Sequence, residues 1–599
     1  MKKLCALILS VVLVSVVLTG CNKSSAGSSS GGKAKNGIEL TILGMVSYQD
    51  DINLVRDMLT KAGFVVKLNM QPDYASFKAQ QDAGNYDLAI SSWTTVTGNP
   101  DYAVRSLFKT GGDYNGSEIS NPKVDELIET AAAQTPAEYV KTYQELEKEL
   151  VDKNAYIIPL YRSVKSQGVN QSILKPETVR ISKALSMAWW SIDFKDASKR
   201  NTQPMITSQA LSSLTTLDPI KGNDGSINMI NSNMYLRLIT LTDDDQVVTG
   251  CSLAYQFAIG QGNSDFYFIL RDDVNFAKVE NMRAVDTGVR VGAEDVVYSL
   301  NRAKDRNSVP DHRTYSLHES MKEISIITDL SVLDTVKDSD TGKTIRQILE
   351  AKTPTAIREL TNNKARVNNN VGVYQLVKVT TNFPFPQVLN YLAHQSAGIV
   401  CADHVRSINT YDVQTFDRTK DIPYGDQRVI TQGPTYNNHL WVSGPYIALY
   451  KDDYGIYFEK NPHFMRGTEH EPVISRYEMK FIADADAQLS AFRSGETYVL
   501  YTVPTSKWDL VKNDPNLKLL TVPSNAVYYL LCNLKGTLSN VNLRLAVLYS
   551  IDQDDILTFY NNNYYRAYTT LTPLVETGNV LIADPAKVND YLNKYWASK

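Results

Sequence analysis

The sequence predicts an α/β fold with a parallel sheet. Near its start, Ile38 to Leu43 (IELTIL) form an apolar run typical of a strand, and Phe64 to Met70 (FVVKLNM) alternate between apolar and polar residues as a second strand does. Between them, Asp50 to Ala62 have the apolar spacing of an amphipathic helix, which Gly63 ends. Strand, helix and strand in this order make a βαβ unit, whose two strands pair in parallel.

The following elements continue this pattern. A third strand is expected at Tyr86 to Ser91 (YDLAIS), followed by a turn at Gly98 to Asp101. Two helices are expected next, at Asn121 to Gln134 and at Pro136 to Asp152. The second helix has a stripe of residues that should face a core, namely Tyr139, Tyr143, Leu146 and Leu150.

The first twenty residues have the composition of a secretory signal. Lys2 and Lys3 precede an apolar run from Leu4 to Leu18, and small residues precede Cys21. A retained signal anchor is the alternative, but the run is shorter than the roughly 20 residues that a spanning helix needs. We therefore expect cleavage before Cys21 and lipid on that cysteine, with more than one acyl chain for stable anchoring. The protein would then lie outside the cytoplasm, held on a membrane.

Residues 21–37 are expected to form a flexible tether. After Cys21 the chain reads NKSSAGSSSGGKAKNG, which has no apolar residue larger than alanine and cannot bury a core. A coil of this length spans roughly 20–25 Å. No later segment is apolar for long enough to cross a bilayer, so the rest of the chain is expected to be soluble.

The composition argues against a nucleic-acid partner. The formal net charge is −4, and the 61 lysines and arginines are dispersed rather than gathered in a stripe. The mature length suits two to four domains of about 150 residues each. Tyrosine is plentiful, with 35 residues against 16 phenylalanines and 6 tryptophans, which suits a binding cleft and equally an ordinary tyrosine-rich surface.

The cysteines say little about function. Cys5 leaves with the signal and Cys21 is the expected lipidation site, so Cys251, Cys401 and Cys532 remain. They are far apart and odd in number. At most one disulfide can form, and three buried free thiols are the equal alternative.

No catalytic motif in the sequence is complete. Gly342-Lys343-Thr344 has the tail of a phosphate-binding loop, but Lys337 stands where its first glycine is needed. His318-Glu319 opens like a zinc-protease helix, but Lys322 stands where the second histidine is needed. The one match to a nucleophile elbow, Gly27 to Gly31, lies in the tether. We therefore expect no enzyme, no metal site and no cofactor.

Three stretches in the first part of the chain have a recognisable pattern. They read GNYDLAISSWTTVTGNPD, then NPKVDELIETAAAQ, then YQELEKELVDKNAYIIPLYRS. These stretches resemble the C-terminal third of the family 5 extracellular solute-binding proteins, the dipeptide and oligopeptide receptors of ABC importers.

Motifs from the opening of that family occur much later in the chain. LDPIKGNDGSINMINSNMYLRL, from Leu217, resembles the family's first strand and helix. FILRDDVNF and VRVGAEDVVYSLNRAKD, within Phe268 to Asp305, resemble its Leu-Arg-x-x-Val-x-Phe and Ala-Glu-Asp-Val signature. SGPYIALY and FEKNPHF, within Ser443 to Phe464, resemble its Gly-Pro-Tyr strand and Arg-Asn-Pro turn. LSAFRSGE and then NVNLRLAVLYSIDQDDIL, from Asn540 to Leu557, resemble the segments around the crossover to the second lobe.

The order of these motifs predicts a circular permutation. It matches the family only if residues 201–599 are read first and the chain is then continued from Gly37. The old ends would be joined near Trp190 to Gln203, a rearrangement that is tolerated where termini lie close together and the new ends fall in an exposed loop. A fusion of two partial copies is the alternative, but no segment is duplicated.

The resemblance implies two α/β lobes that are joined by two strands and close over a ligand, the class II fold of periplasmic binding proteins, with an appended subdomain. Hinge strands are expected near Tyr501 to Ser506 and Ile157 to Tyr161. The expected division of the chain is a signal peptide at 1–20, a lipidated tether at 21–37, the second lobe at 38–154 and 509–599, the first lobe at 155–239 and 432–508, and the appended subdomain at 240–431.

The resemblance also implies where a ligand would bind. Peptide receptors of this family hold an extended ligand largely through backbone hydrogen bonds, so side-chain signals for the site are weak. Core packing is the equal alternative for each tyrosine in the candidate set. By position in the matching motifs, the candidate ligand-binding residues are Ser92, Trp93 and Thr94 on one lobe, Gly225 and Ser226 on the other, and Tyr528, Tyr529 and Asn533 on a late strand.

One position departs from the family pattern. Many peptide-binding members carry an aspartate three residues after the tryptophan, where its carboxylate pairs with the free ammonium group of the ligand. This sequence has Val96 there. A buried ammonium without a partner is costly. Either another acid, Asp101 or Asp224, substitutes for the aspartate, or the ligand lacks a free amino terminus.

The function implied by the resemblance is transport. The protein is expected to be a monomeric receptor that captures a peptide or similar solute and delivers it to an ABC permease in the same membrane. A receptor for a non-peptide solute and a sensory or pheromone receptor remain as alternatives. An extracellular enzyme or adhesin on the same scaffold is the alternative from a different class.

Overall fold

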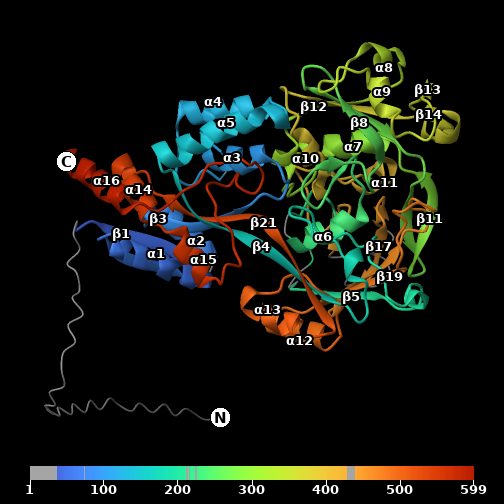
Figure 1. The fold of residues 1–599 in the computed structure, drawn as a ribbon. Helices are drawn as coiled ribbons and strands as arrows, with labels where there is room; N and C mark the ends of the chain where they lie inside the picture. The colour runs from blue at the N-terminus through green and yellow to red at the C-terminus, as the bar shows by residue number, and fades with distance from the viewer. Residues whose placement is uncertain are drawn as a thin grey trace, which may run out of the picture.

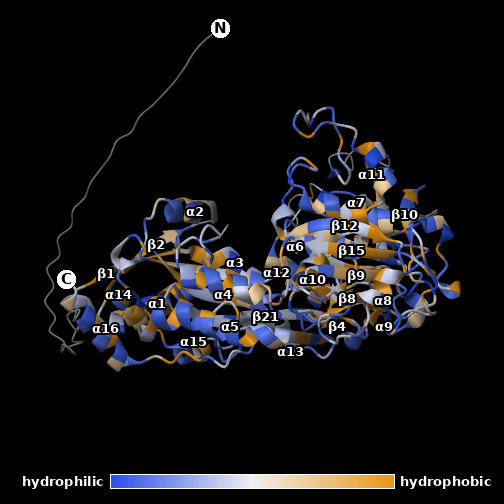
Figure 2. Cartoon of the chain, turned by 90° about the horizontal axis from the view of Figure 1, so that it is seen from above, coloured by the Kyte–Doolittle hydropathy of each residue, from blue (hydrophilic) through white to orange (hydrophobic). Residues whose placement is uncertain are grey.

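The computed structural model describes residues 37–72, 74–112, 114–210, 214, 216–222, 225–427 and 439–599. The expected signal peptide, Cys21 and nearly all of the tether lie outside the described residues, as does Asp224. Figure 1 shows two bodies connected by two long strands, with the blue and red ends of the chain together in one body. Figure 2 shows the same two bodies from above.

A ten-stranded sheet runs through both bodies. Its order is β17-β18-β19-β5-β20-β4-β21-β3-β1-β2. In that order the strands are β17 (Tyr446–Lys451), β18 (Gly455–Lys460), β19 (Arg476–Phe481), β5 (Met205–Gln209), β20 (Val499–Leu500), β4 (Ile157–Asn170), β21 (Leu517–Cys532), β3 (Leu88–Thr94), β1 (Glu39–Met45) and β2 (Val65–Gln71).

The predicted βαβ unit is confirmed. Strands β1 and β2 pair in parallel from Glu39↔Val65 onward, and β1 also pairs in parallel with β3. The helix between β1 and β2, α1 (Gln49–Lys61), buries Ile52 and Val55 on the sheet. Gly63 follows it with φ +94°, a conformation that glycine adopts without strain. The mixed α/β class follows from this unit.

The two ends of the chain form one body, which we call the second lobe. Its core combines buried residues from positions 38–161 with buried residues from positions 527–595. Arg544 donates from Nε to the Asn154 carbonyl at 2.8 Å, and Gln144 donates to the Thr577 carbonyl at 2.9 Å. Both bonds join segments far apart in sequence. The helices of the second lobe are α1, α2 (Tyr74–Asp82), α3 (Pro100–Phe108), α4 (Pro122–Ala132), α5 (Pro136–Lys148), α14 (Val541–Ser550), α15 (Gln553–Phe559) and α16 (Pro585–Ala597).

The helices predicted in this lobe are also confirmed. Helix α4 begins after Asn121, whose side chain accepts from the Lys123 amide at 3.0 Å. Helix α5 is followed by a short π-helical turn at Glu149–Lys153. Of the predicted stripe, Tyr143, Leu146 and Leu150 are fully buried and Tyr139 packs at the edge of the core.

The other body contains the first lobe and a subdomain. The first lobe carries β17, β18, β19, β5 and β20 with α6 (Gly225–Met234), α12 (Ala485–Arg493) and α13 (Trp508–Lys512). The subdomain contains a four-stranded antiparallel sheet of β12 (Met321–Ile327), β15 (Leu376–Thr381), β9 (Asp265–Leu270) and β8 (Ala254–Ile259). Its main helices are α7 (Ala293–Lys304), α10 (Val388–Ala393) and α11 (Ala402–Ile408). Smaller elements are β6 (Thr240–Leu241), β7 (Val247–Val248), β10 (Asn275–Glu280), β11 (Arg283–Arg290), β13 (Glu359–Leu360), β14 (Val373–Tyr374), β16 (Trp441–Val442), α8 (Ser331–Thr335) and α9 (Ile345–Leu349).

Strands β4 and β21 connect the two bodies. They are antiparallel from Leu517↔Asn170 to Leu531↔Ile157, and the register shifts between Pro523 and Val527. Proline cannot donate to the ladder, and such a bulge bends the strand. The crossing on β21 therefore lies near Pro523.

This crossing differs in place from the expected hinge at Tyr501 to Ser506. Trp508 and Val511 pack with Leu489 and Leu500 in one cluster on the first-lobe side. Residues 509–522 thus continue the first lobe in the structure, beyond the boundary expected at residue 508. The cause is the length of β21, which extends the first-lobe sheet before it crosses.

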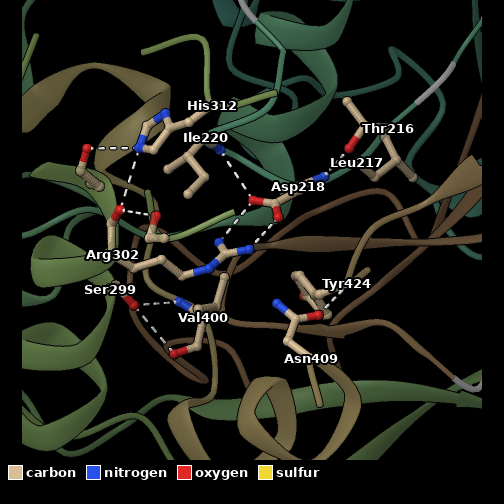
Figure 3. A network of polar contacts seen from close by, with 12 residues as sticks. Thr216, Leu217, Asp218, Ile220, Ser299, Arg302, His312, Val400, Asn409 and Tyr424 are labelled. Carbon is tan, nitrogen blue, oxygen red and sulfur yellow. Dashed lines mark hydrogen bonds and ion pairs between the residues drawn. The ribbon is translucent and has the colours of Figure 1, made fainter. Parts of the chain in front are cut away.

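A buried ion pair fastens the subdomain to the first lobe. Arg302 of α7 donates from Nη1 to Asp218 Oδ1 at 2.9 Å and also contacts the second carboxylate oxygen. The Ile220 amide donates to the same carboxylate at 3.2 Å (Figure 3). Asp218 is 0% exposed and Arg302 is 6% exposed. Burial alone would lower the pKa of Arg302, but the Asp218 charge outweighs it and raises that pKa.

The three remaining cysteines are free thiols. Cys401 and Cys532 are buried and Cys251 is half-buried. The alternative with no disulfide is the one that the structure adopts. Within the described ranges, every helix is too short or too polar to cross a membrane.

Candidate ligand-binding site

A cavity of about 470 Å³ lies between the two bodies. Val96 of the second lobe contributes to its wall, Lys165 and Gln167 line it from β4, and Gly225 and Ser226 line it from the first lobe. This volume falls in the range that holds small-molecule ligands. Because its walls come from both lobes and from a connecting strand, closing or opening the lobes would change it.

The loop at residues 95–99 places Val96 at the cavity. The backbone amide of Asp101 donates to Gln387 Oε1 at 2.8 Å, and Asn99 Nδ2 donates to the same oxygen at 3.2 Å. Gly98 has φ +64°, and a Cβ there would lie 2.7 Å from Asp245 Cγ. Glycine alone fits both this backbone conformation and this approach. The second lobe is therefore held closely against the subdomain beside the cavity.

On the opposite wall, α6 begins at Gly225. A Cβ on Gly225 would meet no atom within 4 Å, so this residue borders open space. Ser226 donates from its hydroxyl to Gln209 Oε1 at 3.2 Å, and both residues line the cavity. Two of the candidate residues therefore line this cavity, and their role in ligand binding stays a prediction.

Lys165 is the charged side chain among the described lining residues. Its ammonium group donates to the Ser182 carbonyl at 2.6 Å and to the Leu185 carbonyl at 3.0 Å. Burial lowers the pKa of Lys165 to about 8, although Asp245 and Asp243 act in the opposite direction. Both aspartates have other partners.

Asp243 pairs with Arg180 at 3.0 Å. Asp245 accepts from Asn525 Nδ2 at 2.6 Å and from the Ala184 amide at 3.1 Å. Burial raises the pKa of Asp245 above its usual value, and these hydrogen bonds oppose that shift. Within the described residues, Lys165 has no ion pair at 4 Å or less.

His394 adds a buried imidazole to the cavity wall. Its Nδ1 accepts from the Ser396 amide at 3.3 Å and lies 2.7 Å from the Ser396 hydroxyl, where the donor depends on the ring tautomer. Burial, together with the nearby Arg237 charge, lowers the pKa of His394 to about 4. The side chain is 4% exposed, and Nε2 has no partner among the described residues. A buried ring nitrogen of this kind calls for a partner.

The sequence-predicted residues of the second lobe lie together on neighbouring strands. Ser92 of β3 faces Tyr528 of β21, and Thr94 faces Ala526. Trp93 packs between Tyr102 and Tyr114, with ring centroids 5.1 and 5.2 Å away. None of Ser92, Trp93 and Thr94 is among the described residues that line the 470 Å³ cavity.

The three candidates from the late strand, Tyr528, Tyr529 and Asn533, lie outside the lining of the 470 Å³ cavity. Tyr529 is 2% exposed in the second-lobe core. Tyr528 stacks on Tyr161 at 4.7 Å, and Tyr161 donates to the Asp51 carboxylate at 3.0 Å. Asn533 donates to the Tyr86 carbonyl at 2.9 Å and so closes a turn. These positions support the sheet and the turn rather than the cavity wall.

Asp101 does not replace the missing aspartate at the cavity. It is 0% exposed and lies outside the cavity lining. Its carboxylate pairs with Arg105 Nε at 2.9 Å and accepts from the Tyr391 hydroxyl at 3.4 Å. Its charge is already balanced by Arg105.

A second large cavity lies between α3 and the subdomain. It measures about 540 Å³ and is lined by Arg105 and Tyr114 on one side and by Arg313 and Phe383 on the other. It is separate from the wall that contains Gly225 and Lys165. It is therefore the competing location for a ligand.

Sequence reasoning did not identify Lys165, Gln167 or His394. Lys165 lies in the stretch LYRSVKSQGVN, where a lysine on a strand gives no sign of facing a cavity. His394 ends α10, more than two hundred residues away in sequence. Only the folded arrangement brings these residues together.

Comparison with known proteins indicates one class, the bacterial extracellular solute-binding proteins. The family model for bacterial extracellular solute-binding proteins, family 5 Middle, matches residues 253–598. The chain is 22% identical over 380 residues to the probable ABC transporter periplasmic-binding protein SapA of Escherichia coli K12, covering 63% of this chain and 58% of that protein. It is 22% identical over 381 residues to the peptide transport periplasmic protein SapA of Salmonella typhimurium, with the same coverage. The chain thus spans about 58% of the length of these curated relatives.

Solved structures also match. NikZ from Campylobacter jejuni in complex with Ni(L-His) is 17% identical with a TM-score of 0.42, covering 65% of this chain and 63% of that one. DppA from Helicobacter pylori in complex with the peptide STSA is 16% identical with a TM-score of 0.41, covering 66% of this chain and 67% of that one.

Proposed function

The chain belongs to family 5 of the bacterial extracellular solute-binding proteins, and from that premise we propose that it is the solute-binding receptor of an ABC importer, capturing peptides or similar solutes by lobe closure. The family binds solutes rather than catalysing reactions. The observation that carries the proposal is the 470 Å³ cavity with walls from both lobes and from β4. An ABC permease in the same membrane would receive the solute.

A peptide is the favoured class of solute because both curated relatives are periplasmic binding proteins of transporters and one is described as a peptide transport protein. A cavity of this volume suits a short peptide or a compact solute of similar size. A non-peptide solute is the second candidate, because Val96 supplies no carboxylate for a peptide ammonium group.

We also propose that the fold is a class II binding protein with its chain circularly permuted. The family match begins at residue 253 and runs to residue 598, which leaves residues 37–252 outside it. Yet residues 38–161 share a single core with residues 527–595. Two lobes and an appended subdomain, with the first crossing at β4 and the second at β21, remain our proposed domain division.

The proposed lipid anchor would act on the second lobe. Ile38 leads directly into β1, which belongs to that lobe (Figure 1). Lipid on Cys21 and a tether at 21–37 would therefore hold the second lobe near the membrane, while the first lobe with its subdomain moves during closure.

Native mass spectrometry of protein purified from its own cells tests the receptor proposal. We expect the folded protein to carry short peptides that are released on denaturation and identified by fragmentation. Because the walls of the cavity come from two lobes, a bound solute should survive purification at neutral pH. Recovery of a sugar or a metal complex without peptides would contradict the peptide assignment.

A further inference from the structure

The cavity between the lobes has an unusual balance of charge. Among its described lining residues, Lys165 is positively charged and none is Asp or Glu. Burial lowers the pKa of His394 to about 4, so its imidazole is neutral at pH 7, and the other described lining residues are uncharged. The wall therefore offers a cation and neutral donors to a ligand.

The Lys165 ammonium is prepared for an additional acceptor. It has three N–H groups, and two of them donate to the Ser182 and Leu185 carbonyls. These bonds fix its direction without neutralising its charge. Asp243 and Asp245, the acids nearest to it electrostatically, are held by Arg180 and Asn525.

Two further polar groups of the wall are unsatisfied. His394 Nε2 is a buried ring nitrogen without a partner in the described chain, and it donates in the tautomer that carries its proton there; Gln167 Oε1 is likewise unpaired. Gln167 is 2% exposed and lies on β4 two residues from Lys165. An amide side chain can turn either its N–H or its oxygen to a ligand. These groups can surround a small anionic group with hydrogen bonds.

Resting on the proposed function, we infer that this cavity binds the carboxylate end of its solute through Lys165 and His394, and that it does not recognise a free ammonium group. A carboxylate accepts several hydrogen bonds and supplies the counter-charge that Lys165 lacks. An ammonium group would instead meet the Lys165 charge at close range, and none of the described lining residues is an acid. Val96 contributes apolar surface at this wall.

The test uses a library of tripeptides prepared in four matched forms: free at both ends, acetylated at the amino end, amidated at the carboxyl end, and blocked at both ends. The full-length protein is incubated with the library, separated from unbound peptide, and its retained peptides are quantified by mass spectrometry. We expect retention of both forms with a free carboxylate, whether or not the amino end is acetylated. We expect at least tenfold lower retention of both amidated forms.

Variants connect this preference to the residues. Lys165→Met is expected to lower retention of the free-carboxylate forms at least tenfold, His394→Leu to lower it several-fold, and Lys165→Arg to keep most of it. Lys183→Met is the matched control, because Lys183 pairs with Asp244 at 2.9 Å and is not a lining residue. It should retain peptides as the wild type does. If Lys165→Met does not fold, the inference is still tested by His394→Leu and by the difference in wild-type retention between the free-carboxylate and amidated peptides.

A variant of Asp224 tests the alternative that the site binds an ammonium group, because the sequence suggested this acid as an ammonium partner. Asp224→Asn is expected to leave retention unchanged. Loss of binding in Asp224→Asn, or retention that follows the free amino end, would overturn the inference while leaving a peptide receptor in place. Retention of no form at all would instead overturn the peptide assignment itself.

The pH dependence gives a second readout. Because Lys165 titrates at about 8, its charge is present below that pH and lost above it. Retention of carboxylate forms should fall several-fold between pH 7 and pH 9.5 in the wild type. Other titratable groups around it are Asp243, Asp245, Arg180 and His394. Lys165→Arg should show a flat profile, and an equally steep fall in that variant would contradict the assignment.

Discussion

Replacing Arg302 with methionine is expected to lower the free energy of unfolding by about 3–5 kcal/mol. The substitution removes one partner of a buried ion pair and leaves the Asp218 carboxylate, which is 0% exposed, without its counter-charge. Methionine is close to the arginine stem in volume, so packing changes little. Urea denaturation of the variant and the wild type, followed by tryptophan fluorescence, measures the difference.

A surface pair supplies the matched control. Arg366 and Glu359 form an ion pair in which the two side chains are 61% and 42% exposed. Arg366→Met should change the free energy of unfolding by no more than about 0.5 kcal/mol, because solvent screens such pairs. The double variant Asp218→Leu with Arg302→Met should recover much of the loss, since it removes both charges. Equal effects of Arg302→Met and Arg366→Met would contradict the structural role given to the buried pair.

Removing residues 38–155 is expected to unfold the chain beyond Asn525 while the remainder stays folded. The deletion takes away β1 and β3, so β21 loses its partner on one side. Leu543, Val547 and Leu548 of α14 are fully buried in the second-lobe core, and each contributes about 1.5–3 kcal/mol through burial. Those contributions are lost together.

Limited trypsin digestion with mass spectrometry measures the outcome. In the full chain, Arg544 is 5% exposed and bonded to the Asn154 carbonyl, so cleavage there should be slow. In the deleted chain, cleavage after Arg544 should become one of the first cuts, while Arg302 in the subdomain stays protected. A protected fragment covering residues 526–599 would show that this segment does not depend on the start of the chain, and would count against the permuted arrangement.

Local periodicity was sufficient to predict part of the second lobe, but α2 was not predicted and only a turn was expected where α3 begins. The βαβ unit at residues 38–70 and the helices after residue 121 follow from apolar spacing and from Gly63, because these signals act over a few residues. One hinge strand was expected near Tyr501 to Ser506, whereas the register shift on β21 lies between Pro523 and Val527. Nothing local in sequence shows that a strand continues through Pro523 into a second body.

The site was harder to predict than the fold. Gly225 and Ser226 were identified because they lie in a recognisable motif at the start of a helix. Tyr529 was ambiguous because β21 lies between β3 and β4 and is buried on its inner face. Lys165 and His394 acquire their roles only when β4 and α10 meet across the cavity, which is a tertiary property.

Hydrogen exchange in the presence and absence of the co-purified solute tests the central claim that the solute binds between the lobes. We expect slower exchange in residues 95–99 of the second lobe and, at the same time, in residues 164–167, 184–187 and 394–396 on the other side of the cavity. Slower exchange confined to one lobe, or centred on Arg105 and Phe383 at the other cavity, would contradict it.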